Sequence, residues 1–142
     1  MSTITVQPIP QGKYLPAVRH KDVVYTSGMT PRKAGKLKFI GQIKADKPID
    51  RYKEAVQLAT SNAIAAAESC LNEGERLSVI LRLNVYLNAE RDFLYHAIVA
   101  DYATDALIEK FGVKCIGSRI AIGVSSLPSN AMVEISLIAT VS

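Results

Sequence analysis

Two alternating segments near the C-terminus constrain the fold of this chain more than any other feature. Apolar residues recur at every second position in residues 117–124 and again in residues 132–139, and turn-forming residues 125–130 lie between them. Side chains alternate between opposite faces of a β-strand, so this period of two predicts two strands. The short polar connection favours their pairing as an antiparallel hairpin.

Each of these predicted strands carries a single charged residue, Arg119 in the first and Glu134 in the second. If the apolar faces of the hairpin lie on the same side, Arg119 and Glu134 share the opposite face. The planar arginine fork matches a carboxylate or a phosphate, so that face would hold either a binding site or a structural ion pair. Spacing alone favours the ion pair.

The size and composition of the chain predict one ordinary globular domain, spanning residues 1–142. Hydrophobic residues make up 49% and charged residues 21%, which is typical of water-soluble proteins. The net charge of +4 is spread along the chain, only 6% of the residues are aromatic and tryptophan is absent. Stacking platforms for nucleic acid are therefore missing, and we expect no nucleic-acid partner.

Neither the N-terminus nor the cysteines indicate export or redox chemistry. Residues 1–4 lack the pattern of a signal peptide and no apolar stretch is long enough to span a bilayer, so we expect a cytoplasmic protein with no membrane partner. Cys70 falls on the apolar stripe of a predicted helix, and Cys115 falls in a loop. Without a CxxC motif or a paired histidine, neither is assigned a catalytic role.

The N-terminal third predicts an extended arm followed by two strands. The high density of prolines favours an extended arm or an edge strand in residues 4–18. Residues 22–28 are rich in β-branched and aromatic residues and end in Ser27 and Gly28, where a glycine would let the backbone approach a ligand. Residues 36–40 are the expected returning strand.

Two later segments have the period of helices. The first helix is expected to begin with Asp50 as its N-cap and to end before Gly74, and the second to span Phe93–Phe111 and end before Gly112. The stripe that the first helix buries consists mostly of small residues: Tyr52, Val56, Ala59, Ala63, Ala66 and Cys70. The corresponding positions of the second helix are Ile98, Tyr102, Ala106 and Phe111.

Between the helices, residues 77–87 alternate strictly, with Leu77 and Leu81 on the same apolar face of one strand. The resulting order of elements predicts a two-layer α+β sandwich, with both helices on one face of a mostly antiparallel sheet. The last three strands also carry apolar residues on their second face: Ile80, Tyr86, Ala121, Met132 and Ile138. Two helices cover only one face, so copies of the chain are expected to cover the other.

The sequence contains none of the motifs that mark a metal or cofactor site. His96 and Asp101 fall on the second helix without a partner at the spacing that metal ligands need. There is also no glycine-rich phosphate loop and no serine, histidine and aspartate set. We therefore expect neither a metal nor a cofactor.

Four motifs are similar to those of the YjgF-like, reactive intermediate deaminase (Rid) family, also called the endoribonuclease L-PSP family. They are Gly12-Lys13-Tyr14, Thr26-Ser27-Gly28, Ser118-Arg119 and Leu127-Pro128-Ser129-Asn130-Ala131-Met132-Val133-Glu134-Ile135. The last motif is the most specific of the four, and the resemblance covers nearly the whole chain.

The resemblance implies a homotrimer with a chorismate-mutase-like fold and a site in each cleft between subunits. It implies hydrolysis of 2-imino acids and their enamine tautomers, such as 2-iminopropanoate, to 2-keto acids and ammonia. By the same resemblance, Arg119 would hold the substrate carboxylate and Glu134 would help to position water. Tyr14 would form a wall of the cleft, and Ser27 with Gly28 its floor.

Three positions depart from the common residues of the family and suggest a side branch. Met29 stands where glutamine is common, Ala121 where cysteine is frequent and Asp101 where asparagine is usual, and all three are expected to bind substrate.

One alternative to the imine deaminase is a trimeric module that binds small carboxylates, such as keto acids, without turnover. Another is an RNA-cleaving or translation-inhibiting protein, for which His20 and His96 form no evident pair.

Overall fold

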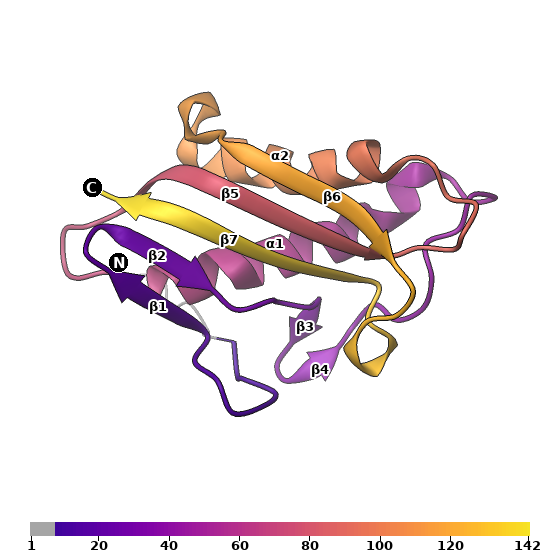
Figure 1. The fold of residues 1–142 in the computed structure, drawn as a ribbon, viewed down its shortest axis with the longest axis horizontal. Helices are drawn as coiled ribbons and strands as arrows, with labels where there is room; N and C mark the ends of the chain where they lie inside the picture. The colour runs from indigo at the N-terminus through magenta and orange to yellow at the C-terminus, as the bar shows by residue number, and fades with distance from the viewer. Residues whose placement is uncertain (1–7) are drawn as a thin grey trace.

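The computed structural model describes residues 8–142, which form a five-stranded sheet covered on one face by two helices (Figure 1). In chain order the elements are β1 (Ala17–His20), β2 (Val23–Thr26), β3 (Arg32–Lys33), β4 (Lys36–Leu37), α1 (Lys53–Glu68), β5 (Leu77–Asn88), α2 (His96–Phe111), β6 (Ser118–Val124) and β7 (Val133–Val141). The large sheet has the strand order β1-β2-β7-β5-β6, and β3 pairs with β4 in a small hairpin. The predicted α+β sandwich is confirmed, and the start of the predicted arm, residues 4–7, lies outside the described residues.

The two C-terminal strands, β6 and β7, do not pair with each other, so the predicted hairpin is wrong. β5 lies between them, parallel to β6 and antiparallel to β7. The chain passes from β5 to β6 through α2, which supplies the long crossover that a parallel pair requires. Alternation determines which residues of a strand share a face, but it does not determine which strand is the neighbour.

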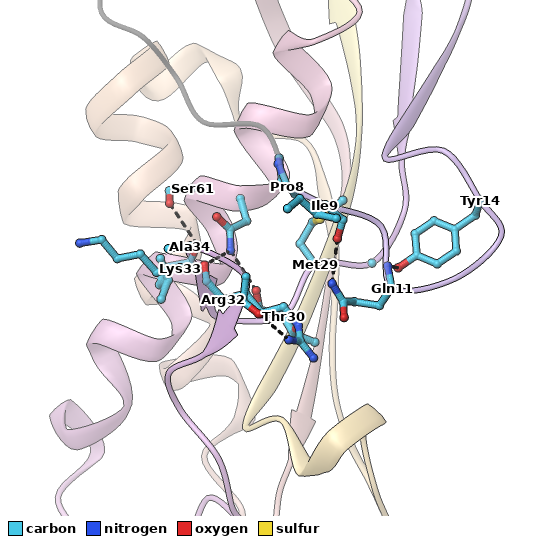
Figure 2. A pocket seen from close by; sticks show the side chains of 14 residues that line it. Pro8, Ile9, Gln11, Tyr14, Met29, Thr30, Arg32, Lys33, Ala34 and Ser61 are labelled. Atoms are coloured by element: carbon cyan, nitrogen blue, oxygen red, sulfur yellow. Dashed lines mark hydrogen bonds between the residues drawn. The ribbon is translucent and has the colours of Figure 1, made fainter.

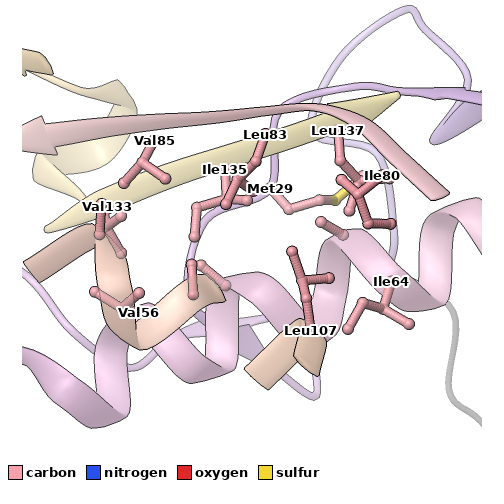
Figure 3. Close-up of a cluster of buried hydrophobic side chains, with 14 of the residues drawn as sticks. Met29, Val56, Ile64, Ile80, Leu83, Val85, Leu107, Val133, Ile135 and Leu137 are labelled. Carbon is pink, nitrogen blue, oxygen red and sulfur yellow. The ribbon is translucent and has the colours of Figure 1, made fainter. Parts of the chain in front are cut away.

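This strand order places Arg119 and Glu134 on opposite faces of the sheet, so the expectation that they share a face is also wrong. Arg119 lies beside Leu83 and Glu134 lies beside Tyr86 in the ladder. Leu83 belongs to the buried core (Figure 3), and Tyr86, three positions further along β5, belongs by alternation to the opposite face. The helices cover only one face of the sheet (Figure 1). Arg119 therefore points toward the helix layer, and Glu134 lies on the open face.

The core lies between the sheet and α1, with α2 packed beside α1 (Figure 3). The predicted stripe is confirmed within α1, since Val56, Ala59, Ala63 and Ala66 are completely buried and the small residues let the helix pack closely. The predicted end is wrong, because α1 ends at Glu68, so that Cys70 lies beyond it and is only partly buried. The predicted N-cap is wrong. Asp50 lies in a 3₁₀ turn, Ile49–Tyr52, that precedes the helix and has no side-chain capping hydrogen bond.

The alternation of β5 breaks near its start, where the pairing with β7 shifts register between Leu77 and Arg82. An irregularity of this kind changes which side chains face the core. Ile80 is consequently buried, at 2% exposure, while Leu81 is 42% exposed. The predictions that Leu81 belongs to the buried face and Ile80 to the second face are therefore wrong.

The second helix, α2, begins at His96 rather than Phe93 and ends before Gly112, where a φ of 86° suits glycine, as expected. Its buried face is not the predicted one, because Ile98 is 49% exposed while Val99 is completely buried. Within residues 8–142, neither helix has the length and apolar character that crossing a membrane demands.

Candidate functional site

Arg119 lies on the edge strand β6, and three oxygen atoms of α2 hold its guanidinium. Its Nη1 donates to Asp101 Oδ1 at 2.7 Å and to Thr104 Oγ1 at 3.0 Å. Its Nη2 donates to the carbonyl oxygen of Ala97 at 3.3 Å. The guanidinium is thus oriented by its own chain, and 26% of the side-chain surface is exposed to solvent.

A cavity of about 220 Å³ lies beside this guanidinium, between α2 and the start of β6. Its polar side chains come from Asp101, Thr104, Ser118 and Arg119. The rest of its lining is apolar or backbone: Ile80, Leu83, Leu107, Cys115, Ile116 and Gly117. A mostly apolar pocket with a few convergent polar groups is typical of small-molecule sites. Burial raises the pKa of the Cys115 thiol, which does not favour a nucleophilic role.

Glu134 lies on β7, on the open face of the sheet, directly against Gly28. Any side chain at position 28 would collide with the Glu134 carboxyl group, so glycine is required for this close approach. Within residues 8–142 that carboxyl group has no ion-pair partner, and its burial raises its pKa. Glu134 is therefore a half-buried acid for which the described part of the chain supplies no compensating charge.

A larger cavity, of about 410 Å³, lies between the N-terminal arm, the β2–β3 connection and α1 (Figure 2). Tyr14, Gly28 and Met29 are among the residues that line it. Ser27 ties the arm to the end of β2, because its hydroxyl donates to the Leu15 carbonyl oxygen at 2.6 Å. Met29 is almost fully buried, at 7% exposure, whereas Tyr14 is 45% exposed.

The structure thus separates the predicted site residues into two groups. The arginine group lies on the helix side of β6 and on α2, and consists of Arg119, Ala121 and Asp101. The glutamate group lies around β2, the start of β7 and the N-terminal arm, and consists of Tyr14, Ser27, Gly28, Met29 and Glu134. Because β5 separates β6 from β7 and the two charges point to opposite faces, one chain does not unite the groups.

The fold and the motifs agree with a single family of known proteins. The family model described as "YjgF/chorismate mutase-like, putative endoribonuclease" matches residues 7–141. This chain belongs to the YjgF family. The family expected from the four motifs is thereby confirmed, and its members share the sandwich of two helices on a mixed, mostly antiparallel sheet.

Three relatives show the range of the YjgF family around this chain. A solved structure of a "putative endoribonuclease" from Shewanella oneidensis is 31% identical, with a TM-score of 0.86 that covers 97% of this chain and 91% of that one. Protein TCP17 of Trypanosoma cruzi is 26% identical over 128 residues, 89% of this chain and 79% of TCP17. TdcF of E. coli, solved with bound serine, is 20% identical with a TM-score of 0.67, covering 94% of this chain and 92% of TdcF, and shows likeness of fold.

Sequence reasoning missed two of the groups that hold the arginine of this YjgF-family chain, the Thr104 hydroxyl and the Ala97 carbonyl. Ala97, Asp101 and Thr104 are spaced by four and three residues, so they share one face of α2. That spacing is a signal in the sequence. The orientation of this face toward β6 depends on the parallel pairing of β5 and β6, which the sequence did not predict.

The side chains around Arg119 include no cluster of metal-ligand residues within the described part of the chain. Among residues 8–142, no three histidine, cysteine, aspartate or glutamate residues come together as ligands. The arrangement around Arg119 can instead hold and orient an anion, because guanidinium N–H groups match carboxylate oxygens.

Proposed function

We propose that this protein hydrolyses reactive 2-imino acids and their enamine tautomers, such as 2-iminopropanoate, to 2-keto acids and ammonia. The observation that carries the proposal is the oriented guanidinium of Arg119 beside a small, mostly apolar cavity. Residues 8–142 engage three of the five N–H groups of this arginine, and the two that they leave can bind a ligand. A carboxylate is well matched to such a pair of donors.

The site would be completed between the one-domain subunits of a homotrimer, where the arginine group of one subunit meets the glutamate group of the next. Support comes from the open face of the sheet, where Tyr25, Ile120 and Ile122 are 41%, 37% and 45% exposed. Apolar side chains gathered on one face favour association. A closed ring of identical subunits would cover this face and bring two different surfaces of the chain together.

In this reaction, water adds to the imine carbon, the carbon–nitrogen bond then breaks and the nitrogen leaves as ammonia. An imine is already electrophilic, so holding its carboxylate with Arg119 and orienting a water molecule with Glu134 would supply most of the acceleration. Burial raises the pKa of Glu134 in the single chain. A guanidinium brought beside it by the next subunit would lower that pKa and favour the ionised form that attracts a water proton.

A trimeric module that binds small carboxylates without turnover is the second candidate. It is favoured by the fact that Arg119 and Glu134 lie apart within one chain, since binding needs only the arginine group. TdcF, which shares the fold, holds serine, and serine carries a carboxylate. RNA cleavage, which the family description names, has less support, because His20 lies on β1 and His96 lies on α2.

Freshly generated 2-iminopropanoate distinguishes these functions. An amino-acid oxidase acting on alanine produces this imine, and we expect the purified protein to accelerate pyruvate release and to reduce trapping of the imine by semicarbazide. Pyruvate release that the protein leaves unchanged, together with measurable pyruvate binding, would instead support the binding module. Cleavage of RNA under the same conditions, without any effect on the imine, would support the ribonuclease.

A further inference from the structure

The three acceptors of Arg119 are arranged so that they occupy one side of its guanidinium. Both N–H groups of Nη1 are used, one by Asp101 at 2.7 Å and the other by Thr104 at 3.0 Å. One N–H group of Nη2 is used by the Ala97 carbonyl at 3.3 Å. The groups that remain are Nε–H and the second N–H of Nη2, which belong to the other edge of the fork.

This remaining edge has no hydrogen-bond acceptor among residues 8–142. Within residues 8–142, the three hydrogen bonds of the guanidinium all start from Nη1 and Nη2, and none starts from Nε. The Arg119 side chain is 26% exposed, and it lines the 220 Å³ cavity together with Asp101 and Thr104. A carboxylate that binds the two remaining N–H groups would displace neither Asp101 nor Thr104.

A purely structural ion pair does not account for the arrangement. The Asp101 side chain is 61% exposed, and exposed ion pairs contribute little to folding stability. Thr104 adds no charge, but as a second acceptor on the same nitrogen it restricts rotation of the guanidinium. Fixing a flexible side chain in its bound orientation before the ligand arrives removes an entropic cost from binding.

We propose that Asp101 and Thr104 are positioning residues, which orient Arg119 so that its Nε–Nη2 edge receives the substrate carboxylate. The identity of that substrate rests on the function proposed above. Asp101 then acts through Arg119, and its expected role as a residue that binds substrate directly is replaced by an indirect one.

Substitutions of matched shape at Thr104 provide the sharpest test. Thr104→Val removes the acceptor with little change in shape, whereas Thr104→Ser retains the hydroxyl. In Thr104→Val, we expect the Kd for pyruvate, measured by isothermal titration calorimetry, and the KM for 2-iminopropanoate to rise roughly 3- to 10-fold, as for one lost hydrogen bond. Thr104→Ser should stay near the wild-type values.

A parallel series at Asp101 tests the charged partner. Asp101→Ala should weaken pyruvate binding at least as much as Thr104→Val, and Asp101→Asn should recover part of the loss because it keeps an acceptor oxygen. Asp105→Asn is the matched control, since Asp105 is exposed on the same helix and the change in charge is identical. This control should change neither Kd nor KM.

Three results with the variants would overturn the proposal. They are unchanged Kd and KM values in both Thr104→Val and Asp101→Ala, a loss that Thr104→Ser and Asp101→Asn fail to recover, and a fall in Tm of more than about 4 °C that parallels each loss of affinity. If the wild-type protein binds pyruvate but leaves 2-iminopropanoate untouched, the proposed hydrolysis fails and the pyruvate series still decides the positioning role. A wild-type protein that binds no pyruvate contradicts the positioning role as well.

Discussion

Arg119 and Glu134 are each the single charged residue of their strand, but their surroundings differ in the hydrogen-bond and charge partners that they provide. α2 provides three hydrogen-bond acceptors to Arg119. The Glu134 carboxyl group has no ion-pair partner within residues 8–142, and burial raises its pKa. A charge that its own chain orients is ready to bind, whereas a half-buried charge without a partner is stabilised when another molecule contributes one. The comparison indicates that the fold of one chain orients the arginine half of the proposed site, whereas the glutamate half needs a charge from another molecule.

Removing the oriented charge should have the largest effect. A charge-assisted hydrogen bond contributes about 1.5 to 3 kcal/mol, so Arg119→Ala should lower kcat/KM for 2-iminopropanoate roughly ten- to more than a hundredfold. Arg119→Lys should lose nearly as much, because an ammonium group lacks the planar fork. Light scattering should still give about three times the chain mass of 15.4 kDa for both variants.

The structural alternative for Arg119 makes a different prediction. If the residue only neutralises Asp101, Arg119→Ala should lower Tm and leave the kinetics of the remaining folded protein intact. Wild-type kcat/KM in a folded, trimeric Arg119→Ala protein would exclude the carboxylate clamp.

Displacing the Glu134 carboxyl group should lower activity less than removing Arg119, and it should affect kcat more than the affinity for pyruvate. In Gly28→Ala the new methyl group would push against the Glu134 carboxyl group, so kcat should fall about tenfold through misplaced water. The affinity for pyruvate, which Arg119 sets, should change little. Glu134→Gln serves as the companion variant, and the double variant should lose no more activity than the more damaging single change. Fully additive losses would show that positions 28 and 134 act independently.

A third charged group, the carboxylate of Glu75, resembles Arg119 because its own chain provides its hydrogen-bond partners. Arg19 donates to it at 2.6 Å and, together with the Asn72 backbone, lowers the pKa of Glu75 from 4.5 to about 2. A depressed pKa stabilises the folded state above pH 4.5, and this contribution disappears as the pH falls from about 4.5 to about 2. Glu75→Gln should therefore flatten the acid side of a plot of Tm against pH.

The effect of Glu75→Gln should be the smallest of the three, because the pair is at the protein surface. Glu73→Gln is a suitable control, since Glu73 is an exposed neighbour in the same loop. An identical loss of Tm between pH 4.5 and pH 2 in Glu75→Gln and in the wild-type protein would contradict the role of the Arg19 pair.

The part of this fold that could be predicted from sequence is the part that depends on local periodicity. The alanine-rich stripe of α1 was correct because a helix buries residues at steps of three and four, whatever surrounds it. The end of α2 at Gly112 was correct because a positive φ favours glycine. The expectation of two helices on one face followed from these local patterns.

The errors with the largest consequences for the site concern contacts between distant segments. The partner of β6 depends on a crossover through α2, and no local pattern reports it. Ile80 rather than Leu81 is buried because the pairing of β5 with β7 shifts register there. The alternating sequence of β5 does not indicate this shift. The same limit applies to the site, because Arg119 was identified by its isolation within a strand while its acceptors lie on α2.

Subunit complementation tests the central claim, that the arginine group of one subunit works with the glutamate group of another. Arg119→Ala and Glu134→Gln subunits, each of low activity alone, would be mixed under conditions that exchange subunits and assayed with 2-iminopropanoate. In a random mixture, about a quarter of the interfaces would join an intact Arg119 to an intact Glu134, so activity should return to roughly a quarter of the wild-type value. Mixed trimers that remain as inactive as either parent would contradict a site shared between subunits.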